Sequence, residues 1–431
     1  MDYKPRKILS RIERFINTND IIVIQGARQT GKTTLLKIII DQLQNQRGIA
    51  KDNIIYFDLE DFALLELCDN GASDVVKYIE AKKRLNKQQK VFLLIDEIQY
   101  LANPSNLLKV LHDHYSHFKL IVSGSSNFDI RKKFKDSLVG RTVDFELFTL
   151  DFDEFLNFKE ASYDLLDNKI FKLEMINDEI LPLYKEYLVY GGYPRITLEK
   201  NIENKEIFLK QIINTYVKKD IRDLAKIKDV NRFNSFLRIL ADSSGKQLNV
   251  LELSNTLGLA RQTIEDYLFI LEKTYVIKLV RPFFSNAKSE ITKMPKIFFE
   301  DTGMLNVLRY GGYIDKIDGV LFENGIYSIL HKSFSDEVIK YWRSKQKREV
   351  DFILDLGRKV IPIETKLSYP EKAGNNLVHF IEKYKQESGL VVSFQKPHKK
   401  GTSTKINFIY PWELFWALNT VLETRKSRVK K

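Results

Sequence analysis

Two glycines, a lysine and three threonines between residues 26 and 34 have the types and the spacing that bind phosphate. The segment reads G-A-R-Q-T-G-K-T-T and follows the apolar run 21–24. Glycine allows backbone angles that a side chain would forbid. The loop can therefore turn its N–H groups around phosphate oxygens, at the positive end of the helix that follows. Lys32 would reach the β- and γ-phosphates, and the Thr33 hydroxyl would bind Mg²⁺.

The strand, loop and helix in this order predict a P-loop that binds ATP together with Mg²⁺. The alternative is an ordinary glycine-containing turn between a strand and a helix, with a Gly-Lys-Thr that occurs by chance. The residues expected to contact the nucleotide are Gly26, Ala27, Arg28, Gln29, Thr30, Gly31, Lys32, Thr33 and Thr34.

Two carboxylates end the next strongly apolar run, because Asp96 and Glu97 directly follow residues 91–95. An uninterrupted apolar run of this length suits a strand that is buried on both faces of a parallel sheet. The carboxyl ends of such strands are where open α/β sheets bind ligands. We expect Asp96 to hold Mg²⁺ and Glu97 to polarise the attacking water. Two acids at an exposed strand end are the alternative.

Further apolar runs complete the expected sheet, at residues 54–57, 119–123 and 142–148. The run at 119–123 ends in the small polar residues S-G-S-S. Ser123 or one of its neighbours could hydrogen-bond the γ-phosphate or the attacking water. A simple serine- and glycine-containing turn explains the same residues, so both interpretations stay open.

The composition sets outer limits on the kind of protein. A length of 431 residues suggests roughly two to four domains. The formal net charge of +12 suits a polyanionic partner such as DNA, although lysine-rich solubility explains it as well. The single cysteine, Cys68, excludes an internal disulfide framework and favours a reducing, cytoplasmic location. No run is long and apolar enough for a membrane span, so we expect no membrane partner.

Several short motifs together resemble one family. They are GARQTGKTT, LLIDEIQ, SGSS, LVGR followed by LFTLDFDEFL, and the later GGYP at residues 191–194. This pattern is similar to the AAA+ ATPases of the prokaryotic "ATP-binding protein" family with a DUF4143-type C-terminal region. The resemblance implies an α/β fold with a parallel sheet of strand order 5-1-4-3-2 and a small helical lid.

The same resemblance implies roles for two arginines. Arg141 precedes the fifth strand, where AAA+ proteins often carry an arginine that acts across a subunit boundary, so a homo-oligomer is implied. A salt-bridged structural arginine is the alternative. Arg195, directly after the GGYP turn, could face the nucleotide from the lid. We expect an AAA+ core at 1–150, a lid at 151–230, a winged helix at 231–300 and a nuclease-like domain at 301–431.

The segment 247–278 has the pattern of a winged helix-turn-helix. Two amphipathic stretches, 250–257 and 261–273, are joined by a tight turn at Gly258, and a strand-like run follows. Arg261, at the start of the second stretch, would contact a base edge or a phosphate. Winged helices also serve as protein-docking elements, which is the alternative to DNA binding.

The last third contains the spaced acids Glu323, Asp351 and Glu364, with Lys366 two residues after the last of them. If residues 350–366 fold into a hairpin, Asp351 lies opposite Glu364. Side chains alternate along a strand, so Glu364 and Lys366 share a face. Pro362 lacks a ladder N–H and favours an edge strand or a bulge.

This E…D…E-x-K set is similar to the PD-(D/E)XK nuclease fold. The resemblance implies that Asp351 and Glu364 bind Mg²⁺ and that Glu323 completes the ligand shell. Lys366 would then orient or deprotonate the attacking water. The alternative is an inactive domain that is retained for binding, or an ordinary charged hairpin.

Together these patterns predict a cytoplasmic, Mg²⁺-dependent ATPase. The ATPase would be coupled to a nucleic-acid-binding winged helix and a nuclease-like domain, and it would act on DNA. The rival interpretation is a nucleotide-dependent switch that binds protein partners and carries a catalytically inactive nuclease-like domain.

Overall fold

The protein is described here as a computed structural model. It describes residues 3–86, 88–125, 138–215, 227, 229–284, 293–357, 359–368, 374–395 and 405–420. The chain divides into two compact units. The first comprises residues 1–148 with 273–275, and the second comprises residues 149–272 with 276–431.

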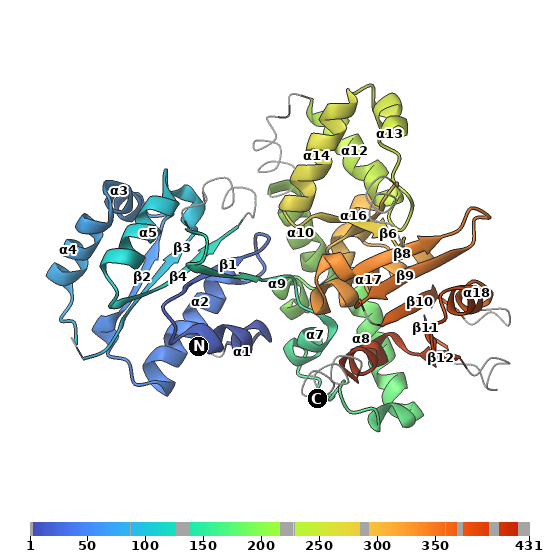
Figure 1. Ribbon diagram of the computed structural model, residues 1–431, viewed down its shortest axis with the longest axis horizontal. Helices are drawn as coiled ribbons and strands as arrows, with labels where there is room; N and C mark the ends of the chain where they lie inside the picture. Colours follow the sequence, from blue (N-terminus) through green and yellow to red (C-terminus); the bar gives the residue numbers. More distant parts are fainter. Residues whose placement is uncertain are drawn as a thin grey trace. The chain divides into compact units, whose positions relative to one another are not determined.

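The first unit alternates strands and helices. Its elements are α1 (Ile8–Ile12), β1 (Ile21–Gln25), α2 (Lys32–Asp41), β2 (Ile54–Asp58), α3 (Phe62–Asn70), α4 (Ala72–Lys82), β3 (Val91–Asp96), α5 (Pro104–His114), β4 (Phe118–Gly124) and β5 (Thr142–Glu146) (Figure 1). Among the described residues the strands form a five-stranded parallel sheet of order β2-β3-β4-β1-β5. The predicted α/β class and strand order are therefore confirmed.

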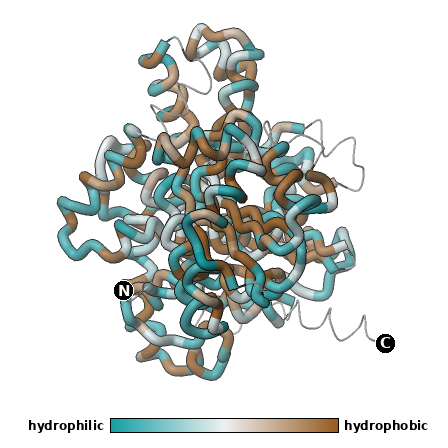
Figure 2. Tube along the Cα trace, turned by 90° about the vertical axis from the view of Figure 1, so that its left-hand side faces the viewer, coloured by the Kyte–Doolittle hydropathy of each residue, from teal (hydrophilic) through white to brown (hydrophobic). Residues whose placement is uncertain are grey.

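The sheet of the first unit is buried on both faces. Every residue of β1, β3 and β4 is buried. Helices α1 and α2 pack on one face, and α3, α4 and α5 pack on the other. Figure 2 shows hydrophobic residues gathered along interior strands and hydrophilic segments towards the outside. This burial is the reason that these strands are continuous apolar runs in the sequence.

The second unit begins with helices and ends with a sheet. Its helices are α7 (Phe152–Phe158), α8 (Glu174–Tyr190), α9 (Pro194–Leu198), α10 (Ile202–Ile212), α12 (Val230–Asp242), α13 (Val250–Leu257), α14 (Arg261–Lys273), α16 (Thr302–Tyr310), α17 (Gly319–Ser333) and α18 (Asn375–Lys383). Its strands are β6 (Ile277–Pro282), β7 (Lys296–Phe299), β8 (Ile339–Arg343), β9 (Glu349–Asp355), β10 (Val360–Lys366), β11 (Gly389–Ser393) and β12 (Ile406–Ile409).

Helices α12 to α14 and the antiparallel hairpin β6–β7 lie in the order that the winged-helix pattern predicted. Helix α13 ends at Gly258, whose φ of 60° is in the left-handed region that glycine adopts readily. The hairpin does not end the sheet, however. Strand β6 pairs in parallel with β8 at Arg281 and Lys340. The sheet is therefore continuous across residue 300, where a boundary between two domains was expected.

In the described part of the second unit, the mixed sheet has the order β12-β11-β10-β9-β8-β6-β7. Strand β10 lies inside this sheet, so the edge position expected from Pro362 is wrong. Pro362 pairs across with Ile353 of β9, and the pairing with β11 starts one residue later, at Ile363. Because the proline lies just before the ladder with β11 begins, its missing N–H is tolerated.

None of the helices in the described ranges is long and apolar enough to cross a membrane.

Candidate functional site

The phosphate-binding loop between β1 and α2 has the backbone that its glycines predicted. Gly31 has a φ of 99° and Gln29 a φ of 62°, both in the left-handed region. Gly26 faces the chain at Leu147, where a Cβ atom would lie 2.1 Å from the carbonyl oxygen. A larger residue at Gly26 would therefore displace the backbone. Left-handed residues in this loop are strained features of the kind that cluster at ligand sites.

Lys32 begins α2, and its ammonium group turns back into the loop. Its Nζ atom donates to the carbonyl oxygens of Gly26, at 3.1 Å, and Ala27, at 2.9 Å. Burial lowers the pKa of Lys32 to about 8, although the nearby Glu97 and Asp96 raise it in part. The two neutral carbonyl oxygens offset the positive charge of the ammonium group only in part, and the anionic oxygens of a phosphate would offset it more.

Asp96, at the end of β3, connects three elements of the first unit. Its Oδ2 atom accepts hydrogen bonds from the Thr33 hydroxyl, at 2.6 Å, and from the Tyr56 hydroxyl, at 3.0 Å. Ser123, at the end of β4, donates to Oδ1. The structure therefore brings together Thr33, Asp96 and Ser123, which the sequence singled out separately. A hydroxyl beside a carboxylate is a donor set that fits Mg²⁺.

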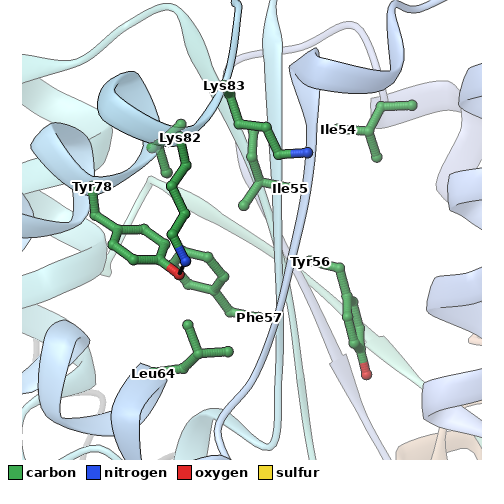
Figure 3. A pocket seen from close by; sticks show the side chains of 9 residues that line it. Ile54, Ile55, Tyr56, Phe57, Leu64, Tyr78, Lys82 and Lys83 are labelled. Carbon is green, nitrogen blue, oxygen red and sulfur yellow. Dashed lines mark hydrogen bonds between the residues drawn. The ribbon is translucent and has the colours of Figure 1, made fainter.

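Tyr56 was not expected at this site. Strand β2 alternates between its two faces, and Figure 3 shows Tyr56 on the opposite side of the strand from Phe57 and Tyr78. Burial and the Asp96 carboxylate raise the pKa of Tyr56 well above its usual value. Its hydroxyl therefore remains a hydrogen-bond donor to Asp96 at neutral pH. The alternation of side chains along β2 could place Tyr56 on one face of the sheet, but it could not show that Tyr56 lies beside Asp96.

A groove of about 240 Å³ runs along β2, and the side chains of Phe57, Leu64 and Tyr78 lie on the opposite side of the strand from the Tyr56 ring (Figure 3). It is lined by Ile54, Ile55, Tyr56, Phe57, Leu64, Tyr78, Ile79, Lys82 and Lys83. Lys82 donates to the Tyr78 hydroxyl at 2.7 Å. Nothing in this groove belongs to the phosphate-binding loop.

Arg6, which precedes the first strand, supports the loop and was missed in the sequence. It is buried, and its guanidinium group donates to the carbonyl oxygens of Thr30, at 2.9 Å, and Phe148, at 2.8 Å. These bonds fix the loop against the segment that follows β5. No local motif marks Arg6, because both of its partners are backbone atoms from distant parts of the chain.

Glu97 follows Asp96 with a φ of 55°, a left-handed conformation for a non-glycine residue. The Gln99 side chain donates to the Glu97 carboxylate and also to the Ser125 hydroxyl, the latter at 3.0 Å. In return, the Ser125 N–H donates to the Gln99 side-chain oxygen at 3.3 Å. Gln99 therefore ties the predicted catalytic acid to the end of β4. A strained backbone at this position is typical of functional sites.

The two predicted arginines lie in different units. The guanidinium group of Arg141 forms two hydrogen bonds with Asp113 of α5, at 2.9 and 3.0 Å. This pair lowers the pKa of the Asp113 carboxyl group. Arg195 is the second residue of α9 in the second unit, and its guanidinium carbon lies 3.6 Å from the Phe208 ring centroid. The nucleotide-directed roles of both arginines remain predictions.

The carboxylates predicted for a nuclease-like site do come close together in the second unit. The ladder between β9 and β10 extends to the pair of Ile363 and Phe352, the residues next to Glu364 and Asp351, and the facing of these two carboxylates stays a prediction. Lys366 lies 2.9 Å from Glu364. Glu323 on α17 is near enough to Asp351 that burial and this carboxylate together raise the pKa of Glu323 to about 8.

The expected metal shell of Glu323, Asp351 and Glu364 is nevertheless not formed. Across the ranges that the structure describes, no group of three His, Cys, Asp or Glu side chains is arranged to hold a metal ion. The Asp351 carboxylate instead accepts hydrogen bonds from the N–H of Thr365, at 2.7 Å, and from its hydroxyl, at 2.8 Å. Glu323 faces the buried Lys296, which was assigned to the winged helix in the sequence.

Models of known families match three parts of the chain. Residues 18–156 match the AAA domain, residues 181–312 match a domain of unknown function (DUF8612), and residues 318–415 match a domain of unknown function (DUF4143). The predicted AAA-type core and DUF4143-type C-terminal region are confirmed at this level.

Relatives of similar length are known from distant organisms. An uncharacterized protein of Haemophilus influenzae is 28% identical over 88% of this chain and 90% of its own. An uncharacterized protein of Methanocaldococcus jannaschii is 26% identical over 81% of this chain and 76% of its own. Both relatives extend over the AAA domain and into the C-terminal region.

Two solved structures with partial likeness are described in nucleotide-bound forms. The Aeropyrum pernix ORC2 protein in its ADP form has a TM-score of 0.36 at 14% identity, over 64% of this chain and 89% of that one. AMPPCP-bound DnaA from Aquifex aeolicus has a TM-score of 0.31 at 16% identity, over 62% of this chain and 88% of that one. Scores this low say nothing about activity. The family matches show that the chain carries an AAA domain with a P-loop, followed by the DUF8612 and DUF4143 domains.

Proposed function

We propose that the protein binds ATP with Mg²⁺ and hydrolyses it at the loop between β1 and α2. The observation that carries this proposal is the 2.6 Å hydrogen bond between the Thr33 hydroxyl and the Asp96 carboxylate, next to the buried Lys32 ammonium group. Three groups that phosphoryl transfer needs therefore meet at the carboxyl edge of one parallel sheet.

The loop residues would hold the triphosphate by backbone N–H groups at the start of α2. Lys32 would exchange its bonds to the Gly26 and Ala27 carbonyl oxygens for bonds to phosphate oxygens. Thr33 and Asp96 would hold Mg²⁺, which when bound supplies positive charge that offsets the charge developing on the phosphoryl oxygens. Tyr56 and Ser123 would keep the Asp96 carboxylate oriented by their hydrogen bonds.

Glu97 would polarise the attacking water. Gln99 holds the Glu97 carboxylate beside Ser125, so the acid is positioned at the end of β4 before any ligand arrives. Ser123 and Ser125 would offer their hydroxyls to the γ-phosphate or the attacking water. A positioned acid of this kind typically contributes about 10²- to 10⁴-fold to the rate.

The test compares Lys32→Ala with Lys37→Ala, an exposed lysine on the same helix. ATP binding is followed by calorimetry and hydrolysis by phosphate release, with and without Mg²⁺. We expect Lys37→Ala to match the wild type and Lys32→Ala to lose both signals. An unaltered phosphate release in a folded Lys32→Ala protein would refute the proposed site.

The finer proposal that ATP hydrolysis acts on DNA is supported by the net charge of +12 and by the winged-helix elements. The start of α14 is less favourable. Arg261 lies 2.8 Å from Glu265, and Gln262 donates to Asp266 at 3.0 Å. Acids on the exposed face of the helix would repel a phosphate backbone.

This arrangement favours the second candidate, a nucleotide-dependent switch that acts on protein partners. Phosphate release with and without duplex or single-stranded DNA, at two salt concentrations, separates the two candidates. Stimulation that fades at higher salt supports DNA as the partner. The same rate with and without DNA, together with no shift of labelled DNA, supports the switch.

Arg141 is proposed to act across a subunit boundary in a homo-oligomer, and its pairing with Asp113 provides a discriminating test. Both Arg141→Ala and Asp113→Ala remove the ion pair, but only the first removes the guanidinium group. A trans-acting arginine predicts that Arg141→Ala loses turnover while Asp113→Ala retains it. If both variants lose thermal stability equally and keep turnover, the arginine is structural.

A further inference from the structure

Lys296, the first residue of β7, has a buried ammonium group surrounded by carboxylates. The residue is 2% exposed. Its Nζ atom lies 3.1 Å from Glu323 Oε1 and 2.6 Å from Glu349 Oε1. The Tyr341 ring lies beneath it, with the centroid 5.6 Å away, within the range of a cation–π contact. A buried lysine that contacts two carboxylates and an aromatic ring is a specific internal arrangement, unlike an exposed ion pair on the surface.

The backbone around Lys296 fixes this arrangement. The side chain of Asn324 accepts from the N–H of Phe299, at 2.8 Å, and donates to its carbonyl oxygen, at 2.9 Å. This pair of bonds holds α17 against β7, so that Glu323 faces Lys296. Gly245 packs closely against the Glu323 carboxylate, because a Cβ atom at Gly245 would lie 2.9 Å from Glu323 Oε2.

We propose that Lys296 is a permanent cation that replaces a divalent metal ion in the carboxylate cluster of the second unit. The cluster comprises Glu323, Glu349, Asp351 and Glu364. On this proposal the second unit neither needs nor binds Mg²⁺ at these residues, and it does not cleave nucleic acid by a metal-dependent route.

The contacts of each carboxylate support this assignment. Glu323 and Glu349 share Lys296, Asp351 accepts from Thr365, and Glu364 pairs with Lys366. Within the described residues, Glu364 Oε2 is buried without a hydrogen-bond partner. Each of the four side chains is therefore already engaged through one carboxylate oxygen by a cation or a donor of the chain itself, and a metal ion shared by them would have to displace these partners.

A metal ion would also have to enter beside an ammonium group of like charge. The Lys296 Nζ atom already lies between Glu323 Oε1, at 3.1 Å, and Glu349 Oε1, at 2.6 Å, which is the position that a cation shared by these two carboxylates would take. A second cation in the same cluster would be repelled at low local dielectric, unless the lysine moved away from its partners.

The proposal also explains why one sheet crosses the expected domain boundary. Lys296 lies in the segment that matches DUF8612, and Glu323 and Glu349 lie in the segment that matches DUF4143. The two ion pairs of Lys296 join these segments in one buried cluster. Because the cation is a side chain of the protein, the contact between the two segments does not depend on a bound metal ion.

The experiment titrates Mn²⁺ alone, without nucleotide, into the full chain and follows binding by calorimetry and the melting temperature by fluorimetry. Any Mn²⁺ bound at the ATP site is the same in variants of the second unit, so the comparison is between variants. For the wild type and Glu364→Gln we expect identical Mn²⁺ binding. A binding event in the wild type that Glu364→Gln weakens tenfold or more would overturn the proposal.

Lys296→Met tests the converse, with the exposed Lys293→Met as its matched control. We expect Lys293→Met to melt as the wild type does. Lys296→Met should melt at a lower temperature, and millimolar Mn²⁺ should recover part of the loss. The recovery should disappear in Lys296→Met combined with Glu323→Gln. A Lys296→Met protein that melts normally would contradict the proposal, and if it does not fold, the Glu364→Gln comparison decides alone.

Discussion

The Thr33 hydroxyl donates a hydrogen bond of 2.6 Å to the Asp96 carboxylate, across 63 positions of sequence. Thr33 lies in the first turn of the helix after β1, and Asp96 ends β3. The carboxyl ends of parallel strands share one edge of the sheet, which brings the two residues together. The predictions below begin at this pair.

Replacing Thr33 by valine keeps the shape of the side chain and removes the hydroxyl. Because the hydroxyl is the proposed ligand for Mg²⁺, hydrolysis should fall by about 10²-fold or more, on the scale of losing a positioned electrostatic contact. The measurement is phosphate release over a range of Mg²⁺ concentrations. Thr18→Val, in the same unit, should behave as the wild type. Normal Mg²⁺ dependence in Thr33→Val would exclude the hydroxyl as a ligand.

Replacing Glu97 by glutamine should separate binding from hydrolysis. The amide cannot polarise water as a carboxylate does, so turnover should fall by about 10²-fold or more. ATP affinity should remain close to that of the wild type, since Glu97 is not expected to hold phosphate. Calorimetry measures the affinity and single-turnover hydrolysis measures the chemical step. The exposed Glu80→Gln is the control, and a wild-type rate in Glu97→Gln would require another base.

Replacing Arg6 by methionine should destabilise the first unit and weaken ATP binding together. The change removes the donor to the buried Thr30 carbonyl oxygen and the hydrogen bond to the Phe148 carbonyl oxygen, which costs on the order of 1–3 kcal/mol. Urea unfolding measures the loss, with the exposed Arg14→Met as control. A stable variant with normal ATP affinity would show that the loop keeps its conformation without Arg6.

ATP binding should be coupled to proton uptake near pH 8. In the free protein burial lowers the pKa of Lys32 to about 8. A phosphate beside the ammonium group should raise the pKa again, so affinity should fall as the pH rises through 8. At that pH about half a proton should be taken up per ATP. Binding enthalpies in two buffers of different ionisation enthalpy measure it, and equal enthalpies would contradict the prediction.

The lowered pKa of Lys32 also sets the sign of its effect on stability without ligand. Between about pH 8 and the ordinary lysine value, the unfolded chain binds more protons than the folded chain. The free energy of unfolding should therefore increase as the pH rises across this window, because the buried lysine loses its charge. Below about pH 8 the lysine is charged and its burial destabilises the fold in full.

His331 should make the second unit more stable in mild acid than in base. Burial lowers the pKa of His331, but Glu300 and Asp336, at 2.8 and 2.5 Å, outweigh burial and raise it to about 9. The folded pKa exceeds the unfolded one, so this stabilisation is complete below about pH 6.5 and disappears as the pH rises through 9.

The measurement is urea unfolding of the wild type and His331→Gln at pH 6 and at pH 10. The wild type should be the more stable by on the order of 2 kcal/mol at pH 6, and the difference should shrink at pH 10. His379→Gln serves as the control. A difference that is independent of pH would mean that His331 contributes packing alone.

Much of the first unit could be predicted because its signals are local. The glycines of the loop, the apolar run before Asp96 and the fifth strand each occupy a few adjacent residues. The parallel arrangement then places their ends together without further information. Arg6 and Tyr56 could not be predicted in this way, because their partners lie far away in the sequence: Arg6 donates to two backbone carbonyl oxygens, and Tyr56 donates to Asp96.

The second unit shows the opposite case. The helix-turn-helix order and the register of β9 and β10 followed from local patterns. The pairing of β6 with β8 did not, and it places Lys296 among carboxylates assigned to another domain. The spacing of Glu323, Asp351 and Glu364 suggested a metal ion, but spacing cannot show which cation the fold supplies.

By itself, the sequence determined the P-loop core and the apolar strands of its sheet, whereas the strand order came from the resemblance of its motifs to AAA+ ATPases. The reason is that backbone conformation and strand burial depend on neighbouring residues. Only the tertiary structure decided which partner each charged side chain finds. Arg6 donates to the Thr30 carbonyl oxygen of the loop, Arg141 pairs with Asp113, and Lys296 pairs with Glu323 and Glu349. Charge pairing depends on distance in space, and long-range sheet pairing sets that distance.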